Sequence, residues 1–210
     1  MQAERCAPRR EPAIRFFASS HQLHQLAPRT RILCTLFLLG ILGQALSGII
    51  MHHLGPGWAP SEIATYYRGD DAAPAIGGDR FGLGDDTDPS TPPRSMTVAR
   101  TFGSLLEVAH LHLVAMPLVL FVVAHLFSMI DAGRGRWGGA LCYGGFAGAA
   151  LDISMPFAVR YGSAAFAPLK LAGFVLLEAC LVVMVVLTLI AGIASFFSTP
   201  SGSGRFSRAD

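Results

Sequence analysis

Charged side chains are scarce in this sequence: they make up 14% of its 210 residues, whereas 52% of the residues are hydrophobic. An ordinary soluble domain is about 25% charged. Together with a mean hydropathy of +0.48, the shortage of charge predicts an integral membrane protein whose main partner is the lipid bilayer. The formal net charge is only +2, so nothing indicates a nucleic-acid partner.

Cysteine is also rare, and no C-x-x-C pair occurs. The spacing of the four cysteines excludes a thiolate zinc site and gives no disulfide framework. Three of them lie in apolar segments, where we interpret them as small buried side chains. The sequence also lacks an H-E-x-x-H motif and a run of histidine boxes. It therefore indicates neither a hydrolase nor a desaturase and identifies no enzyme reaction. The cysteines are Cys6, Cys34, Cys142 and Cys180.

Long apolar runs dominate the rest of the chain, and a bilayer core of about 30 Å requires about 20 such residues in a helix. The runs are continuous rather than alternating, which favours helices over a spanning barrel. We expect an all-α fold, an integral membrane four-helix bundle over 32–197. A long loop (55–103), an Arg-rich and disordered tail (1–31) and a second tail (198–210) complete the chain. The predicted spans are 32–54, 104–130, 137–159 and 171–197.

Arginine distribution predicts the orientation of the bundle. The loop 55–103 carries four arginines against seven acidic residues, as expected for a translocated segment. The other connections and tails are rich in arginine, which favours a cytoplasmic location for both termini. We expect a multi-pass protein of the bacterial inner (cell) membrane. The arginines on the expected cytoplasmic side are Arg5, Arg9, Arg10, Arg15, Arg29, Arg31, Arg134, Arg136, Arg205 and Arg208.

Ionisable side chains inside the predicted spans gather at one depth. In an up-down bundle, the end of the first span, the start of the second, the end of the third and the start of the fourth share one layer under the non-cytoplasmic face. Such side chains are costly in a bilayer and mark functional sites. The members of this layer are His52, His53, Glu107, His110, His112, Asp152, Lys170 and Glu178.

Helical spacing predicts which members of this layer face the interior. In the first span Gly40, Gln44, Gly48 and His52 recur at four-residue steps, and in the third Gly144, Gly148 and Asp152 do the same. Such stripes of small residues allow close helix packing, which places His52 and Asp152 inward. A Gly-rich third span also offers a surface for a homo-oligomer or a membrane-protein partner.

Structural interpretations compete with functional ones for several residues of the second span and its neighbours. Glu107 shares a face with His110 and His125, whereas His112 points nearly the opposite way. Ser104 and Glu107 also match a capping box, so Glu107 could simply close the helix start. Near the interface, His53 and His112 could reach toward water, and Lys170 could do the same or pair with Glu178.

Two imidazoles on neighbouring helices are the ligands that clasp a b-type haem, so His52 and His110 are the candidate haem ligands. A transition-metal ion held by His52, His110, Glu107, Asp152 and Glu178 is the alternative with mixed nitrogen and oxygen donors. Either would make the protein redox-linked, for instance in electron transfer. A third possibility needs no cofactor: the same groups could relay protons or bind a cation in a small transporter or an accessory subunit.

Two resemblances accompany these patterns. The positions of His52 and His110, and the fifteen residues between His110 and His125, resemble the four-helix membrane cytochromes b, which implies haem binding. No second histidine lies at the depth of His125 on another span, so only one haem is implied. The E-x-x-H-x-H motif at Glu107–His112, with TYYRG at 65–69, resembles a group of uncharacterised small bacterial inner-membrane proteins and implies a four-span topology.

Overall fold

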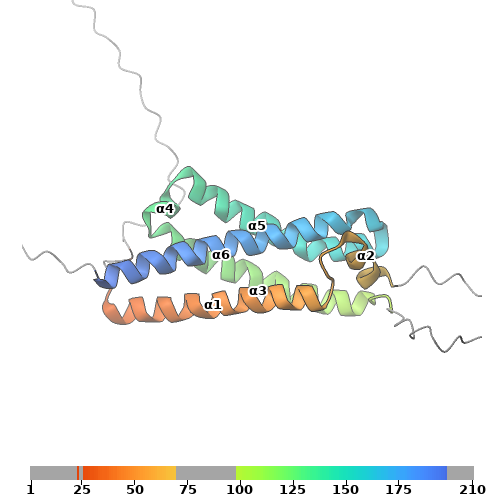
Figure 1. Cartoon of the computed structure of the whole chain (residues 1–210), viewed down its shortest axis with the longest axis horizontal. Coiled ribbons are helices and arrows are strands. Elements are labelled where there is room, and N and C mark those ends of the chain that lie inside the picture. The colour runs from red at the N-terminus through yellow and green to blue at the C-terminus, as the bar shows by residue number, and fades with distance from the viewer. Residues whose placement is uncertain (1–22, 24–25, 70–97, 198–210) are drawn as a thin grey trace, which may run out of the picture.

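The computed structural model describes residues 23, 26–69 and 98–197 of the chain (Figure 1). These ranges are helical and contain no strand, which confirms the predicted all-α class for the part of the chain they cover. The predicted tails, except for residues 23 and 26–31, and the 70–97 part of the loop lie outside them. The elements are α1 (Pro28–Leu54), α2 (Pro60–Arg68), α3 (Phe102–Ser128), α4 (Asp131–Arg134), α5 (Arg136–Phe157), the π-helical turn η2 (Ala158–Gly162), the 3-10 turn η3 (Ala164–Phe166) and α6 (Ala167–Phe197).

Long helices occupy all four predicted spans, but only three are long and apolar enough to cross a membrane by length and composition. The three segments are Pro28–Leu54, Phe102–Ser128 and Ala164–Ala194. The fourth, α5, has 22 residues and is about 33 Å long at 1.5 Å per residue, which is long enough to cross a bilayer core. It is rich in glycine and carries Asp152, and it has no stretch as apolar as those of the other three segments.

The four long helices run side by side along the long axis of the molecule, and successive helices run in opposite directions (Figure 1). The first residues of α1 and the last residues of α6 therefore lie at the same end of the bundle, and α2 lies at the opposite end. The helix α6 packs against α1, α3 and α5 and is the centre of the bundle. Within the described residues, α1 and α3 are not a closely packed pair.

Glycine brings α5 and α6 into close contact. A Cβ atom added at Gly148 would lie 2.5 Å from the backbone nitrogen of Leu177, and one at Gly173 would lie 2.9 Å from the backbone nitrogen of Asp152. Such distances are too short for any side chain. The glycine stripe of α5 thus serves packing within this chain. Small residues commonly allow such close contacts between membrane helices.

Among the described residues, the larger buried cluster lies in the half of the bundle away from α2, and a smaller one that includes Ile63 and Tyr67 lies at the α2 end. Leu38, Leu120, Phe127, Met184 and Val185 are each at most 2% exposed and pack together from α1, α3 and α6. By contrast, α1 and α3 expose many large apolar side chains on their outer surfaces. An apolar outer surface of this extent is what a bilayer covers.

The start of α3 excludes one structural interpretation of Glu107. Its N-cap is Thr101, whose hydroxyl oxygen accepts a hydrogen bond from the backbone N–H of Ser104 at 3.2 Å. A Thr side chain in this position satisfies an otherwise unpaired backbone donor. The capping box of Ser104 and Glu107, one of the two roles considered for Glu107, does not form, because both residues already lie within the helix. The carboxyl group of Glu107 is free of that structural role.

Candidate functional site

A cavity of about 910 Å³ lies between α1 and α3, and α5 and α6 form its inner wall. Its volume falls within the usual range of about 300–1,000 Å³ for small-molecule sites. The cavity exists because α1 and α3 each pack on α6 but not closely on each other. Six of the eight side chains in the predicted polar layer line it: His52, Glu107, His112, Asp152, Lys170 and Glu178.

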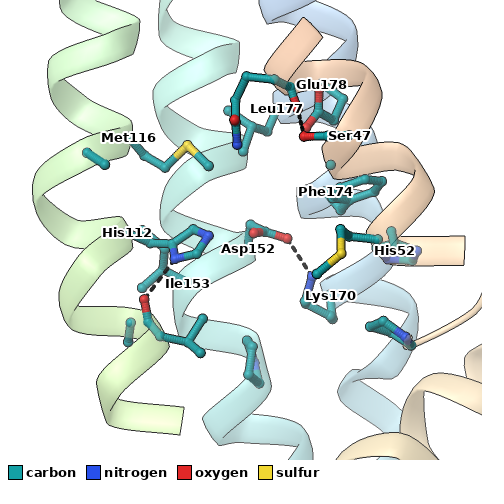
Figure 2. A pocket seen from close by; sticks show the side chains of 18 of the residues that line it. Ser47, His52, His112, Met116, Asp152, Ile153, Lys170, Phe174, Leu177 and Glu178 are labelled. Carbon is teal, nitrogen blue, oxygen red and sulfur yellow. Dashed lines mark hydrogen bonds and ion pairs between the residues drawn. The ribbon is translucent and has the colours of Figure 1, made fainter. Parts of the chain in front are cut away.

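An ion pair lies at the centre of the polar wall (Figure 2). The Nζ atom of Lys170 on α6 lies 2.5 Å from an Oδ atom of Asp152 on α5. The two side chains are 6% and 15% exposed. The charges compensate each other, which is the condition under which charged side chains persist away from water. The predicted pairing of Lys170 with Glu178 is absent among the described contacts.

His52, on α1, contacts two aromatic rings. Its ring stacks on that of Phe174 at a centroid distance of 4.0 Å, and the Trp58 ring lies 4.9 Å away. The side chain is 5% exposed, and neither ring nitrogen has a hydrogen-bond partner among the described residues. A buried imidazole without partners forfeits about 1–3 kcal/mol per unsatisfied group. The ring nitrogens of His52 are therefore available to form hydrogen bonds with a ligand in the cavity.

Glu178 lies further along α6, beside α1. A Cβ atom added at Gly48 would lie 3.0 Å from the Oε1 atom of Glu178, so glycine at this position makes room for the carboxyl group. The Oε2 atom is buried and has no partner among the described residues. Figure 2 shows Glu178 and Ser47 near one end of the view, with Lys170 and His52 further along. Lys170 and Glu178 are eight residues apart on α6, so the polar wall is about two helical turns long.

The short helix α2 covers the end of the bundle and reaches the mouth of the cavity. The carboxylate of Glu62 accepts hydrogen bonds from the backbone N–H groups of Trp58 and Ala59, each at 3.0 Å, and so holds the start of the helix. Arg100 donates to the hydroxyl of Tyr66 at 2.6 Å. Burial raises the pKa of the neighbouring Tyr67 phenol. Tyr66, Tyr67 and Arg100 all line the cavity.

Comparison with known proteins places this architecture in a family. Residues 57–195 match a family described as a transmembrane helical domain. The chain belongs to this family. No curated protein and no solved structure matches the chain. The family match runs from α2 through most of α6 and so includes Arg100, Asp152, Lys170 and Glu178. The helix α1, which carries His52, precedes the range that matches the transmembrane helical domain.

The predicted site residues on α3 fall on different sides of the helix. His110 and His125 are exposed, and neither lines the cavity. Glu107 and His112 do line it, and the Nδ1 atom of His112 lies 2.8 Å from the carbonyl oxygen of Val108. In Figure 2 the imidazole of His112 lies on the α3 side of Asp152. The side of α3 that faces the cavity therefore carries Glu107, as expected, and His112 in place of His110.

The other predicted positions agree with the helical spacing. Gly40, Gln44, Gly48 and His52 all line the cavity, as their four-residue steps predicted, and so does Asp152. His53 lies outside the cavity and accepts a hydrogen bond from the Trp58 indole at 3.2 Å. In the ranges that the structure describes, no group of three His, Cys, Asp or Glu side chains could hold a metal ion.

Sequence reasoning missed the residues at the mouth. Tyr66 and Tyr67 come from α2 and Arg100 from the segment before α3, and all three lie outside the predicted spans. The paired tyrosines at 66–67 were a signal for two of them, because tyrosine is typical of the border between a membrane and water. No such signal marked Arg100.

Proposed function

We propose that this chain is a four-span protein of the bacterial inner membrane that binds a small ligand in the intramembrane cavity without a resident cofactor. It would act as a small transporter or as an accessory subunit of a membrane complex. In this proposal α5 is the fourth span and both termini are cytoplasmic. The observation that carries the proposal is the compensated Asp152–Lys170 pair beside the unpartnered ring of His52, all lining one cavity.

Three features support ligand binding over a purely structural role for these polar groups. A structural network satisfies its own hydrogen bonds, whereas His52 and the Oε2 atom of Glu178 remain unpartnered in the described structure. The cavity is also large enough for a small molecule. Finally, it is lined by all four long helices at once, which is how bundles build ligand sites.

Native mass spectrometry of the detergent-purified protein tests this function. Gly40 lines the cavity, and a Cβ atom added there meets nothing within 4 Å, so Gly40→Phe places a ring in open space. Gly43 on the same helix is equally open but lies outside the cavity, so Gly43→Phe is the matched control. We expect a bound small molecule in the wild type and in Gly43→Phe, and its loss in Gly40→Phe. Equal occupancy in all three proteins would refute the proposal.

A haem b or a metal ion is a second candidate, and the unpartnered ring of His52 favours it. The donor set fits poorly, because the intended second ligand, His110, is exposed and lies outside the cavity. An oxidised-minus-reduced visible spectrum with elemental analysis of the same sample decides between the candidates. A sharp α-band in the reduced spectrum that disappears in His52→Ala would show a bound haem and overturn the cofactor-free proposal. A featureless spectrum and no bound metal would support it.

A further inference from the structure

The cavity changes character along its length. Its end near α2 carries the polar side chains His52, Asp152 and Lys170. Deeper in the bundle, an apolar end is lined by Ile41, Ala45, Met116, Val119 and Leu181. Ser104 and Val119 are the first and last residues of α3 that line the cavity. The helix rises about 22 Å between them, so the cavity covers much of the thickness of a bilayer core. A ligand that fills it must itself be polar at one end and apolar at the other.

The cavity also opens sideways. Gly40 and Gln44 on α1 and Val108 and Ala115 on α3 line it and are nevertheless exposed. They lie on the two helices that border the space where α1 and α3 do not pack closely. In a spanning bundle, an opening at this depth faces lipid rather than water. A ligand dissolved in the bilayer could therefore pass between α1 and α3.

The polar end favours a neutral head group that carries oxygen atoms. Lys170, the cation beside Phe174 and His52, is already paired with Asp152. The carboxyl groups of Glu107 and Glu178 also line the cavity and outnumber Arg100, the cation at its mouth, so its wall does not favour an anionic head. A neutral imidazole offers one donor and one acceptor, and both nitrogens of His52 lack a described partner. A carbonyl oxygen would accept from the donor nitrogen.

Aromatic rings beside this donor favour a flat head. His52 and Phe174 are stacked with an interplanar angle of 24°, and the Trp58 ring lies 6.0 Å from that of Phe174. Planar rings pack well against such surfaces through offset or edge contacts. A planar ring with carbonyl groups therefore matches both the hydrogen-bonding capacity and the shape of the polar end.

We infer that the cavity binds a membrane-soluble amphipath with a neutral, planar, carbonyl-bearing ring and a long apolar tail, the chemistry of a prenylated quinone. This inference rests on the proposed ligand-binding function and names the class of ligand. The ring lies at the polar end, where His52 donates to a carbonyl oxygen. The tail lies along the apolar end beside α1 and α3.

Fluorescence of Trp58 reports on the ring. The protein has two tryptophans, so Trp137→Phe leaves Trp58 as the single indole, 4.9 Å from the His52 ring. In this background the purified protein is titrated with decylubiquinone. We expect saturable quenching, about tenfold weaker binding in His52→Ala, and unchanged binding in the matched control His110→Ala. If the alanine variant fails to fold, His52→Gln replaces it, because glutamine keeps a hydrogen-bond donor and an acceptor. We expect this variant to retain part of the affinity for decylubiquinone.

The tail is tested with the two glycine variants. Gly40→Phe should weaken binding of decylubiquinone about tenfold or more, because its ring occupies the apolar end, and Gly43→Phe should not. A quinone of the same ring without a tail should bind the two variants equally. Loss of both quinones in Gly40→Phe, or of neither, would contradict the placement of the tail.

Oleate separates failure of this inference from failure of the proposed function. Oleate has the same kind of apolar tail but an anionic head. Saturable binding of oleate that Gly40→Phe abolishes, with no saturable binding of decylubiquinone, would overturn the quinone class and leave the ligand-binding function intact. Binding of neither probe would overturn the inference, and with no co-purified molecule it would overturn the function as well. Quenching that is identical in His52→Ala and His110→Ala would also refute the inference.

Discussion

Lys170 on α6 donates a hydrogen bond to Asp152 on α5 at 2.5 Å, and the pair joins two helices that glycine already holds in close contact. Each partner is costly to bury alone, whereas the pair presents little net charge to the cavity. The same interaction therefore stabilises the packing of α5 on α6 and makes the cavity wall electrically neutral. Both effects depend on the two residues being present together.

Removing one partner of this pair should lower the free energy of unfolding more than removing both. We expect Asp152→Asn and Lys170→Met to lower stability by about 3–5 kcal/mol each, because each leaves a buried group without its counter-charge. The double variant should recover most of that loss, and thermal unfolding in detergent measures it. Additive losses in the double variant would show that the two side chains act independently.

The number of spans can be tested with single cysteines in a background free of the four natural ones. Asp131 lies between α3 and α5, and Ser163 between α5 and α6. If α5 crosses the membrane, a membrane-impermeant thiol reagent should label Ser163→Cys in intact cells. It should label Asp131→Cys only after permeabilisation. Labelling of both from the same side would mean that α5 does not cross.

Substitution by alanine should have different effects on stability at two glycines. Gly148→Ala forces a Cβ atom to within 2.5 Å of the Leu177 backbone, so α5 and α6 must separate. We expect a loss of at least about 1–3 kcal/mol, similar to overpacking in other cores. Gly43→Ala meets open space and should be neutral or stabilising by up to about 1 kcal/mol, because alanine favours helix. Reversible unfolding in mixed detergent compares the two, and a neutral Gly148→Ala would contradict the close packing.

Alkaline pH should weaken the attachment of α2. Burial raises the pKa of Tyr67 above the value of about 10 that it has in an unfolded chain. The folded protein then holds this proton more tightly, so the contribution to stability is complete below pH 10 and is lost as the pH rises above it. Melting temperatures measured between pH 8 and 11 should fall more steeply for the wild type than for Tyr67→Phe. Parallel curves would exclude this contribution.

Much of the fold could be predicted because long apolar runs have few alternatives in a chain of this composition. Helices cover all four predicted spans, and their starts differ from prediction by at most four residues. The start of α3 was less predictable. Thr101 and Ser104 can each cap a helix, and only the backbone conformation shows that Thr101 does so.

The site was predictable where small residues marked a face and not where every face was apolar. The stripe ending in His52 and the stripe ending in Asp152 identified inward positions correctly. On α3 the side chains around the helix are similarly hydrophobic, so spacing related His110 to His112 without revealing which faced inward. Lys170 and Glu178 are eight residues apart on one helix, about 12 Å along its axis, which is too far for the pairing we expected.

The glycine contacts between α5 and α6 bear on how the protein is made. Among the four long helices, α5 alone falls short of the hydropathy that marks a spanning segment, so it gains least from entering lipid by itself. Its neighbour α6 follows after only a short turn and supplies both the matching surface and the counter-charge for Asp152. If α5 crosses the membrane as proposed, the two helices should leave the translocation channel as one hairpin. Synthesis of α6 should then be the step that commits α5 to the bilayer.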